Sequence, residues 1–240
     1  MTPFIGELLG TTLLVTLGDG VVANVALART KGHQGGWIVV TAGWGFAVAI
    51  AVYAAHAASG GHLNPAVTIG LAATGQFDWP LVPTYLAAQL LGGILGGVIV
   101  WLAYLNHWAA TDDPDAKRAV FCTAPAIRSP AANLLTEIIG TCVLTLGTAL
   151  ILTPDNFKLD SGLDSSFRGL LVGLVVFSIG LSLGGPTGYA INPARDLGPR
   201  IAHALLPIPG KGPSDWGYAW VPVIGPLIGG VLGASLSLVL

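Results

Sequence analysis

The tripeptide Asn-Pro-Ala occurs twice in this 240-residue chain, at Asn64-Pro65-Ala66 and at Asn192-Pro193-Ala194. Proline is favoured at the first position of a helix, where its missing N–H would have no partner in any case. The asparagine before it then becomes the N-cap, whose side-chain oxygen accepts a hydrogen bond from a backbone N–H further on. The side-chain NH2 is left over as a fixed donor, which an aspartate or a serine would not supply. Each tripeptide therefore predicts a helix start that carries a polar donor.

The composition around both copies is that of a membrane protein. Hydrophobic residues make up 53% of the chain and charged residues 9%, with a mean hydropathy of +0.74. Soluble domains carry about 25% charged residues. A net charge of −2 gives no basic field for nucleic acid. The two cysteines, Cys122 and Cys142, have no metal-like or redox-like spacing, and neither a metal nor another cofactor is expected.

Six stretches are long and apolar enough to cross a bilayer, which takes about 20 residues. They are approximately Phe4–Ala28, Trp37–Ala57, Leu81–Leu105, Ala132–Thr153, Phe167–Leu183 and Trp220–Leu240. The first is interpreted as an uncleaved span, because no basic region or cleavage site precedes it. Two shorter apolar segments follow Asn64 and Asn192 and end near Gly75 and Pro207. At about 1.5 Å per residue, these helices cross about half of the membrane. The predicted fold is an all-α membrane protein of six transmembrane helices and two half-helices.

The two halves of the chain are similar to each other. Glu7–Thr11 matches Glu137–Thr141, Thr16–Gly18 matches Thr145–Gly147, and the Asn-Pro-Ala copies follow at nearly the same offset. We interpret residues 1–240 as one channel domain, with repeats at approximately 1–105 and 131–240 and a polar linker at 106–130. Three crossings per repeat invert the second repeat, which predicts a site near the midplane. There the two caps would face each other, and the positive ends of both helix dipoles would repel cations.

The sequences around the caps carry a family resemblance. Ser59–Thr68 reads Ser-Gly-Gly-His-Leu-Asn-Pro-Ala-Val-Thr, and Gly188–Asp196 reads Gly-Tyr-Ala-Ile-Asn-Pro-Ala-Arg-Asp. Both resemble the aquaporin family, and more closely its glycerol-facilitator branch. The resemblance implies a passive channel, not an enzyme, for glycerol, water and other small neutral solutes, with exclusion of ions and protons. It further implies a homotetramer in the lipid bilayer of a bacterial plasma membrane, with both termini cytoplasmic.

The same resemblance implies a selectivity filter of four residues: Trp44, Gly180, Tyr189 and Arg195. Glycerol facilitators combine a tryptophan, a second aromatic residue and a glycine with the arginine. Trp44 and Tyr189 would form an apolar corner for a carbon chain, and Gly180 would make room. Hydroxyl groups would be bound by Arg195 and by the loop carbonyls of Gly61, His62, Tyr189 and Ala190. Two residues depart from the expected pattern. Tyr189 stands where a phenylalanine is expected, and Asp19 stands where a small neutral residue is expected.

Three acidic residues are expected to support the pore loops: Glu7, Glu137 and Asp196. Glu7 and Glu137 lie at equivalent points of the repeat and could form a proton relay. The favoured interpretation is that they accept hydrogen bonds from the loops ahead of the half-helices. Loop backbone at membrane depth must find such partners or line a water-filled cavity.

Several alternatives stay open on the sequence alone. The main solute could be undissociated lactic acid, dihydroxyacetone, urea or hydrogen peroxide instead of glycerol. An ion-coupled secondary transporter also uses inverted repeats and broken helices, but it would need carboxylates at the midplane. The positive-inside rule disagrees with the implied topology, because six of the basic residues would lie in outer loops: Arg29, Lys31, Lys117, Arg118, Arg128 and Lys211.

Overall fold

The computed structural model describes residues 1–152 and 163–239, with only the backbone described at 163–166. The described part of the chain is helical and contains no strand. Six long helices are α1 (Pro3–Ala26), α2 (Trp37–Ser59), α4 (Val82–Ala103), α7 (Pro130–Ile151), α8 (Leu163–Leu183) and α10 (Val221–Leu236). Two half-helices are α3 (Pro65–Ala73) and α9 (Pro193–Leu205). Three short elements are η1 (Trp79–Leu81), α5 (Leu105–Ala110) and α6 (Pro114–Ala119).

The long helices differ in how much of a bilayer each could cross. Within the described residues, four of them, α1, α2, α7 and α4 together with η1, are long and apolar enough to span a membrane by length and composition. The apolar stretches of the other two are shorter, at Phe167–Leu183 in α8 and Val221–Leu236 in α10. The sixth predicted span, Trp220–Leu240, is therefore too long, since α10 ends at Leu236 and the chain continues in turns. Its 16 residues correspond to about 24 Å.

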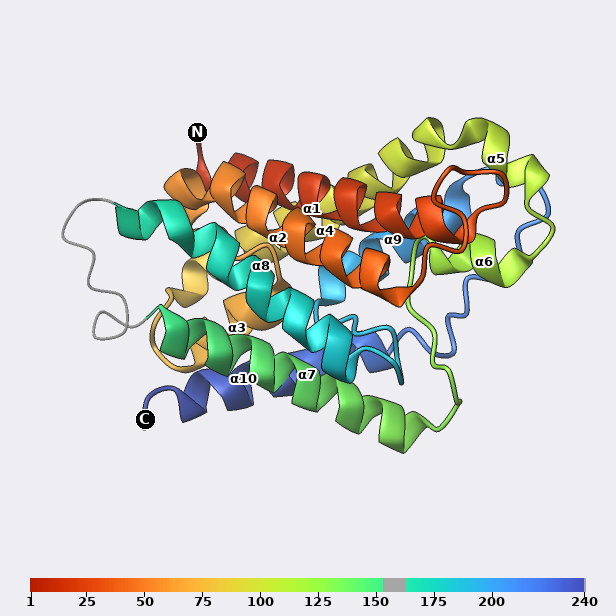
Figure 1. The fold of residues 1–240 in the computed structure, drawn as a ribbon. Coiled ribbons are helices and arrows are strands. Elements are labelled where there is room, and N and C mark those ends of the chain that lie inside the picture. Colours follow the sequence, from red (N-terminus) through yellow and green to blue (C-terminus); the bar gives the residue numbers. More distant parts are fainter. Residues whose placement is uncertain (153–162, 240) are drawn as a thin grey trace.

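The half-helices have the expected lengths, and each packs against a long helix from the other half of the chain. α3 has 9 residues and α9 has 13. α3 packs against α10, and α9 packs against α4, so each half-helix lies on the last long helix of the other half (Figure 1). α2 and α8 also pack against each other and join the halves. The second half thus repeats the arrangement of the first.

Glycines allow the half-helices to approach these partners. A Cβ atom placed on Gly93 of α4 would lie 2.5 Å from the carbonyl oxygen of Ala194, and one on Gly230 of α10 would lie 2.4 Å from that of Ala66. Both distances are too short for any side chain. The small residues of α4 and α10 therefore serve close helix packing, as expected for helices in lipid.

The segment at 106–130, predicted as a polar linker, is more ordered than its composition suggests. It contains α6 and most of α5. Trp108 and Phe121 are fully buried and stack on each other, in a cluster that also includes Leu27 at the end of α1. Apolar residues spaced between the charges of this segment fold it back onto the helices, which gives the molecule a second core.

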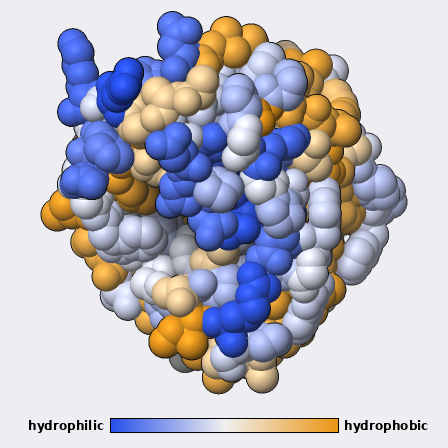
Figure 2. Space-filling view, turned by 90° about the vertical axis from the view of Figure 1, so that its right-hand side faces the viewer, coloured by the Kyte–Doolittle hydropathy of each residue, from blue (hydrophilic) through white to orange (hydrophobic). Residues whose placement is uncertain are grey.

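The two ends of the molecule differ. The N- and C-termini lie at one end, and α5 and α6 lie at the other (Figure 1). Figure 2 views the α5–α6 end, where hydrophilic side chains cover much of the surface and hydrophobic ones appear toward the rim. The chain therefore has a polar cap at this end of an otherwise apolar bundle.

Candidate functional site

A cavity of about 400 Å³ lies between the two halves of the molecule. The loops at 60–64 and 189–192 line it together with side chains of α1, α2, α7 and α8. Both predicted pore loops therefore reach the same space. Because these loops carry Asn64 and Asn192, the starts of both half-helices meet at this cavity.

Asn64 and Asn192 cap the two half-helices. Asn64 Oδ1 accepts from the backbone N–H of Ala66 at 2.9 Å, and Asn192 Oδ1 accepts from those of Ala194 at 3.0 Å and Arg195 at 3.2 Å. Pro65 and Pro193 occupy the first helical position. Local sequence is enough to produce these caps, because every atom involved lies within three residues.

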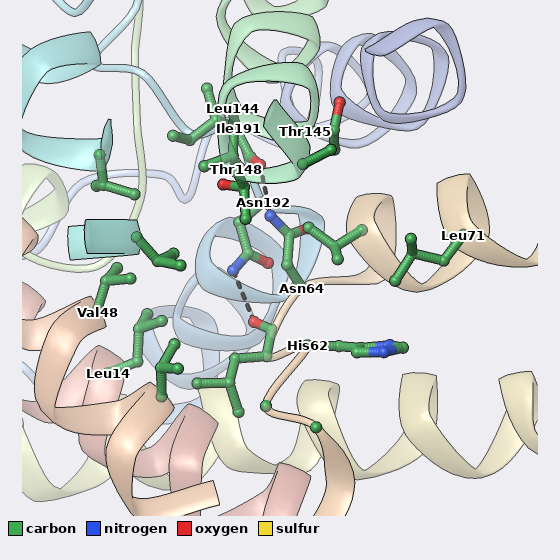
Figure 3. Close-up of a pocket in the computed structure, with 18 of the residues that line it drawn as sticks. Leu14, Val48, His62, Asn64, Leu71, Leu144, Thr145, Thr148, Ile191 and Asn192 are labelled. Carbon is green, nitrogen blue, oxygen red and sulfur yellow. Dashed lines mark hydrogen bonds between the residues drawn. The ribbon is translucent and has the colours of Figure 1, made fainter. Parts of the chain in front are cut away.

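The side-chain NH2 groups of the two asparagines are not wholly free, which corrects the expectation from sequence. Asn64 Nδ2 donates to the carbonyl oxygen of Ile191, and Asn192 Nδ2 donates to that of Leu63, both at 2.8 Å (Figure 3). Each amide nitrogen carries two hydrogens, so one donor remains at each asparagine. These two reciprocal hydrogen bonds connect the loops and fix the orientation of the remaining N–H donor on each asparagine.

Glu7 and Glu137 hold the loops from behind. Glu7 is fully buried and accepts from the backbone N–H groups of His62 at 2.9 Å and Leu63 at 2.7 Å. Glu137 is also buried and accepts from those of Ala190 at 3.1 Å and Ile191 at 2.8 Å. In this geometry the two glutamates accept hydrogen bonds from the loops ahead of the half-helices. Without these acceptors, four backbone donors would be unpaired at membrane depth.

The braced loops adopt unusual backbone conformations at equivalent positions. Gly61 and Leu63 have φ of 68° and 52°, and Tyr189 and Ile191 have φ of 40° and 44°. A positive φ is uncommon for residues other than glycine, and for β-branched Ile191 it is a clear outlier. Such residues cost about 1–3 kcal/mol each and persist only where the surroundings hold them.

This conformation leaves a row of backbone acceptors without partners. The carbonyl oxygens of Gly61, His62, Tyr189 and Ala190 accept no hydrogen bond from any described residue. All four residues line the cavity. The His62 ring points away from the asparagines (Figure 3), with its Nδ1 3.1 Å from Thr68 Oγ1, and it packs on Phe77 and Tyr85.

The four residues expected to form a filter come together in two pairs. The Arg195 guanidinium lies over the Trp44 ring, with 3.9 Å between Cζ and the ring centroid. A Cβ atom on Gly180 would lie 2.8 Å from Tyr189 Cζ. Trp44, Tyr189 and Arg195 line the cavity, whereas Gly180 lies behind the tyrosine ring. Gly180 therefore makes room for the Tyr189 ring.

Polar groups on these three lining residues form no hydrogen bond with the described residues. Trp44 Nε1 and the Tyr189 hydroxyl are buried without a hydrogen bond, and the Arg195 guanidinium donates none within the described ranges. An unpaired buried donor or acceptor costs about 1–3 kcal/mol. A molecule with hydroxyl groups in the cavity could pair with all three.

Asp196 is placed differently from the expectation. It accepts from the backbone N–H and hydroxyl of Thr123 at 2.8 and 2.7 Å, and from Arg200 at 2.8 and 2.9 Å. Among the described residues, its carboxylate accepts no hydrogen bond from the loops ahead of the half-helices. Asp196 therefore joins α9 to the segment that follows α6. This segment belongs to the linker at 106–130, so its contact with Asp196 depends on how the linker folds.

Trp37 is a residue that sequence reasoning missed. Its indole N–H donates to the carbonyl oxygen of Gly180 at 2.9 Å, and its ring meets that of Tyr189 edge-on at 5.7 Å. Trp37 thus holds the tyrosine in place. Nothing in the local sequence points to this contact, because its partners are more than 140 residues away along the chain.

Comparisons with known proteins agree with this geometry. A model of the family described as major intrinsic protein matches residues 1–237. The chain is 63% identical over 236 residues to the probable glycerol uptake facilitator protein of Thermotoga maritima, with 98% of each chain covered. It is 57% identical to the glycerol uptake facilitator protein of Bacillus subtilis, which covers 97% of this chain and 82% of that one.

The fold is also that of a solved structure. The aquaglyceroporin from Plasmodium falciparum superimposes with a TM-score of 0.85 at 33% identity, covering 98% of this chain and 93% of the other. The six long helices and two capped half-helices of this chain agree with the family that the sequence comparisons show. The chain therefore belongs to the major intrinsic protein family.

Proposed function

We propose that the protein is a passive channel for glycerol and other small neutral solutes, including water. The main support is the set of polar groups on Trp44, Tyr189 and Arg195 that form no hydrogen bond with the described residues, in a cavity that apolar residues such as Leu14 and Val48 also line. A polyol has one face of hydroxyl groups and one of carbon atoms, and it matches both kinds of lining residue. Relatives named as glycerol uptake facilitators support the same solute.

Exclusion of ions follows from the charges around the path. The N-termini of α3 and α9 both point at the asparagines, and each carries about half a positive charge. The Arg195 guanidinium adds a fixed cationic group that lines the path at the filter. Among the described residues that line the cavity there is no Asp or Glu. The site therefore lacks the carboxylates that an ion-coupled transporter would use, which favours passive conduction.

Stopped-flow measurements on proteoliposomes test this function. We expect glycerol to cross much faster than in protein-free vesicles, with no dependence on a proton or sodium gradient. Gradient-dependent flux would contradict a passive channel.

Gly180→Ala tests the filter. The new methyl group would push Tyr189 toward the path, and we expect glycerol flux to fall several-fold more than water flux. Gly185→Ala is the matched control, because a Cβ at Gly185 meets nothing within 4 Å. Equal losses of glycerol and water flux in Gly180→Ala would contradict the filter assignment.

Undissociated lactic acid is a second candidate solute. The chain is 39% identical to the D/L-lactic acid transporter of Lactiplantibacillus plantarum, with 96% of this chain and 94% of that one covered. A panel of glycerol, lactic acid, dihydroxyacetone, urea and hydrogen peroxide on the same vesicles would rank them. Lactic acid flux above glycerol flux at equal gradients would make it the main solute.

The membrane orientation is part of the proposal. We place both termini in the cytoplasm of a bacterial cell, and α5 and α6 outside. Several outer basic residues have structural partners that explain their position: the Lys211 Nζ donates to carbonyls at the end of α9, Lys117 to Pro209, and Arg128 pairs with Asp215. The loop that holds Lys158 lies outside the described residues.

Cysteine labelling tests this orientation. Asp78 immediately precedes η1, and Asp112 lies between α5 and α6, which are at the end of the molecule opposite the termini; both residues are exposed. We expect an impermeant thiol reagent to label only Asp112→Cys in intact cells. Labelling of Asp78→Cys alone would reverse the orientation.

We further propose a homotetramer with one path in each protomer. Large apolar side chains are exposed along the outer faces of the helices, among them Leu9 and Leu13 of α1 and Phe46 and Ile50 of α2. Lipid and neighbouring copies would share this surface. Light scattering of the detergent-solubilised protein should give the mass of four 24.4-kDa chains, and the mass of a single chain would contradict it.

A further inference from the structure

Asp19 lies beside the filter on α1 and is 1% exposed. Neither of its carboxylate oxygens has a hydrogen-bond partner among the described residues. Its Oδ1 lies 3.8 Å from Arg195 Nη1, in an ion pair that is too long for a hydrogen bond. A buried carboxylate normally has partners that compensate for the loss of water. Here the compensation comes from a single charge across a short gap.

The second arginine of α9 shows what a structural pair looks like. Arg200 contacts Asp196 at 2.8 Å and also donates to the carbonyl oxygens of Thr123 and Ser214. Its donors are used by the protein. Arg195 has the same kind of acid beside it, but its guanidinium keeps every N–H donor free within the described part of the chain.

Packing fixes the position of Asp19. A Cβ atom on the adjacent Gly18 would lie 2.2 Å from Trp44 Cζ3, so α1 is pressed directly against the Trp44 ring. The same ring supports the Arg195 guanidinium. Asp19 does not itself line the cavity. It can therefore act on a solute only through Arg195.

We propose that Asp19 is a built-in counter-charge that makes the filter electrically neutral without using the hydrogen-bond donors of Arg195. Without it, Arg195 and the two half-helix N-termini would present positive charge at successive points of the path, and small anions would be attracted. With it, a solute meets N–H donors but little net charge. Asp19 is thus a positioning residue that deepens the proposed function, on which this inference rests, by adding the exclusion of anions.

Asp19→Asn tests the sign of this effect, because the amide keeps the shape and removes the charge. The probe is nitrate, which has no neutral form at neutral pH, with potassium carried by valinomycin across the proteoliposome membrane. We expect the ratio of nitrate to glycerol permeability to rise by about tenfold or more, as fields of a single sign concentrate counter-ions to that degree. Asp112→Asn removes an equal charge at an exposed position that does not line the cavity and should leave the ratio unchanged. An unchanged ratio in assembled Asp19→Asn protein would overturn the proposal.

A second pair of variants serves if Asp19→Asn does not assemble. Arg195→Gln leaves Asp19 as the unbalanced charge, and we expect potassium leak to increase. The double variant Asp19→Asn with Arg195→Gln removes both charges. Its potassium leak should be lower than that of Arg195→Gln alone, by about tenfold as in the nitrate experiment. Equal leaks in the two proteins would show that the filter does not sense the charge of Asp19.

Different results would refute the proposed function and the role of Asp19. Absence of glycerol flux through the unaltered protein would refute the glycerol channel. Normal glycerol flux with no change in ion selectivity in these variants would refute only the role of Asp19. A purely structural role would lower all fluxes together and leave the nitrate-to-glycerol ratio unchanged, which would also overturn the proposal.

Discussion

The loops at 60–64 and 188–192, with the half-helices that follow them, are two versions of one design. Both have an asparagine cap, a glutamate brace and three residues with positive φ at matching places. They differ where Gly61 and Val67 of the first correspond to Tyr189 and Arg195 of the second. The comparison teaches that the pore centre is built from positions the halves share. The filter is built from positions at which they differ.

The position after the arginine shows the same divergence. In the first half, the Thr68 hydroxyl accepts from Gln89 Nε2 at 3.0 Å and lies beside the His62 ring. In the second half, Asp196 forms an ion pair with Arg200 and binds Thr123. Both residues anchor a half-helix to its surroundings. The stronger, charged anchor is in the half that carries the filter.

The largest expected effect comes from removing the shared braces. Glu7→Ala and Glu137→Ala each leave two backbone N–H groups buried without an acceptor, at about 1–3 kcal/mol per group. We expect both variants to unfold at clearly lower temperature in detergent. Protein that survives as Glu137→Ala should also lose its preference for glycerol over water, because Tyr189 lies in that loop. A stable Glu137→Ala protein with normal glycerol and water flux would contradict the shared role of the two glutamates.

A smaller effect is expected from replacing either capping asparagine with aspartate. Asn64→Asp and Asn192→Asp keep the capping oxygen but lose the donor to the opposite loop, and they place a carboxylate 2.8 Å from a carbonyl oxygen. We expect each to destabilise the protein by about 1–3 kcal/mol and to weaken cation exclusion. Potassium leak in vesicles measures this. Since the two contacts are equivalent, a large leak in only one variant would contradict the shared role.

The smallest effect is expected from Tyr189→Phe, which tests a position at which the halves differ. The hydroxyl has no partner among the described residues, so we expect no loss of stability. If it bonds the solute, glycerol permeability should fall about 2- to 10-fold, as expected for one neutral hydrogen bond. Tyr218→Phe is the control, because its hydroxyl is also buried and unpaired but does not line the cavity. Equal glycerol fluxes in both variants would remove Tyr189 from the set of solute contacts.

Much of the fold could be predicted from the sequence. The spans follow from hydrophobic length, the half-helix starts from Asn-Pro, and the repeat from matched positions such as Glu7 and Glu137. The sequence did not reveal the places where distant residues meet. The linker at 106–130 packs Trp108 and Phe121 into a core, and Asp196 binds Thr123 instead of the pore loops.

By itself, the sequence determined the local chemistry: two capped half-helices in an apolar chain, and an arginine one turn into the second. These features involve atoms within a few residues of each other, so backbone geometry alone produces them. Only the tertiary structure decided that each asparagine amide binds the opposite loop, that Gly180 yields its space to Tyr189, and that Asp19 lies beside Arg195. Such contacts depend on how closely the helices pack, which small residues permit but no local pattern specifies.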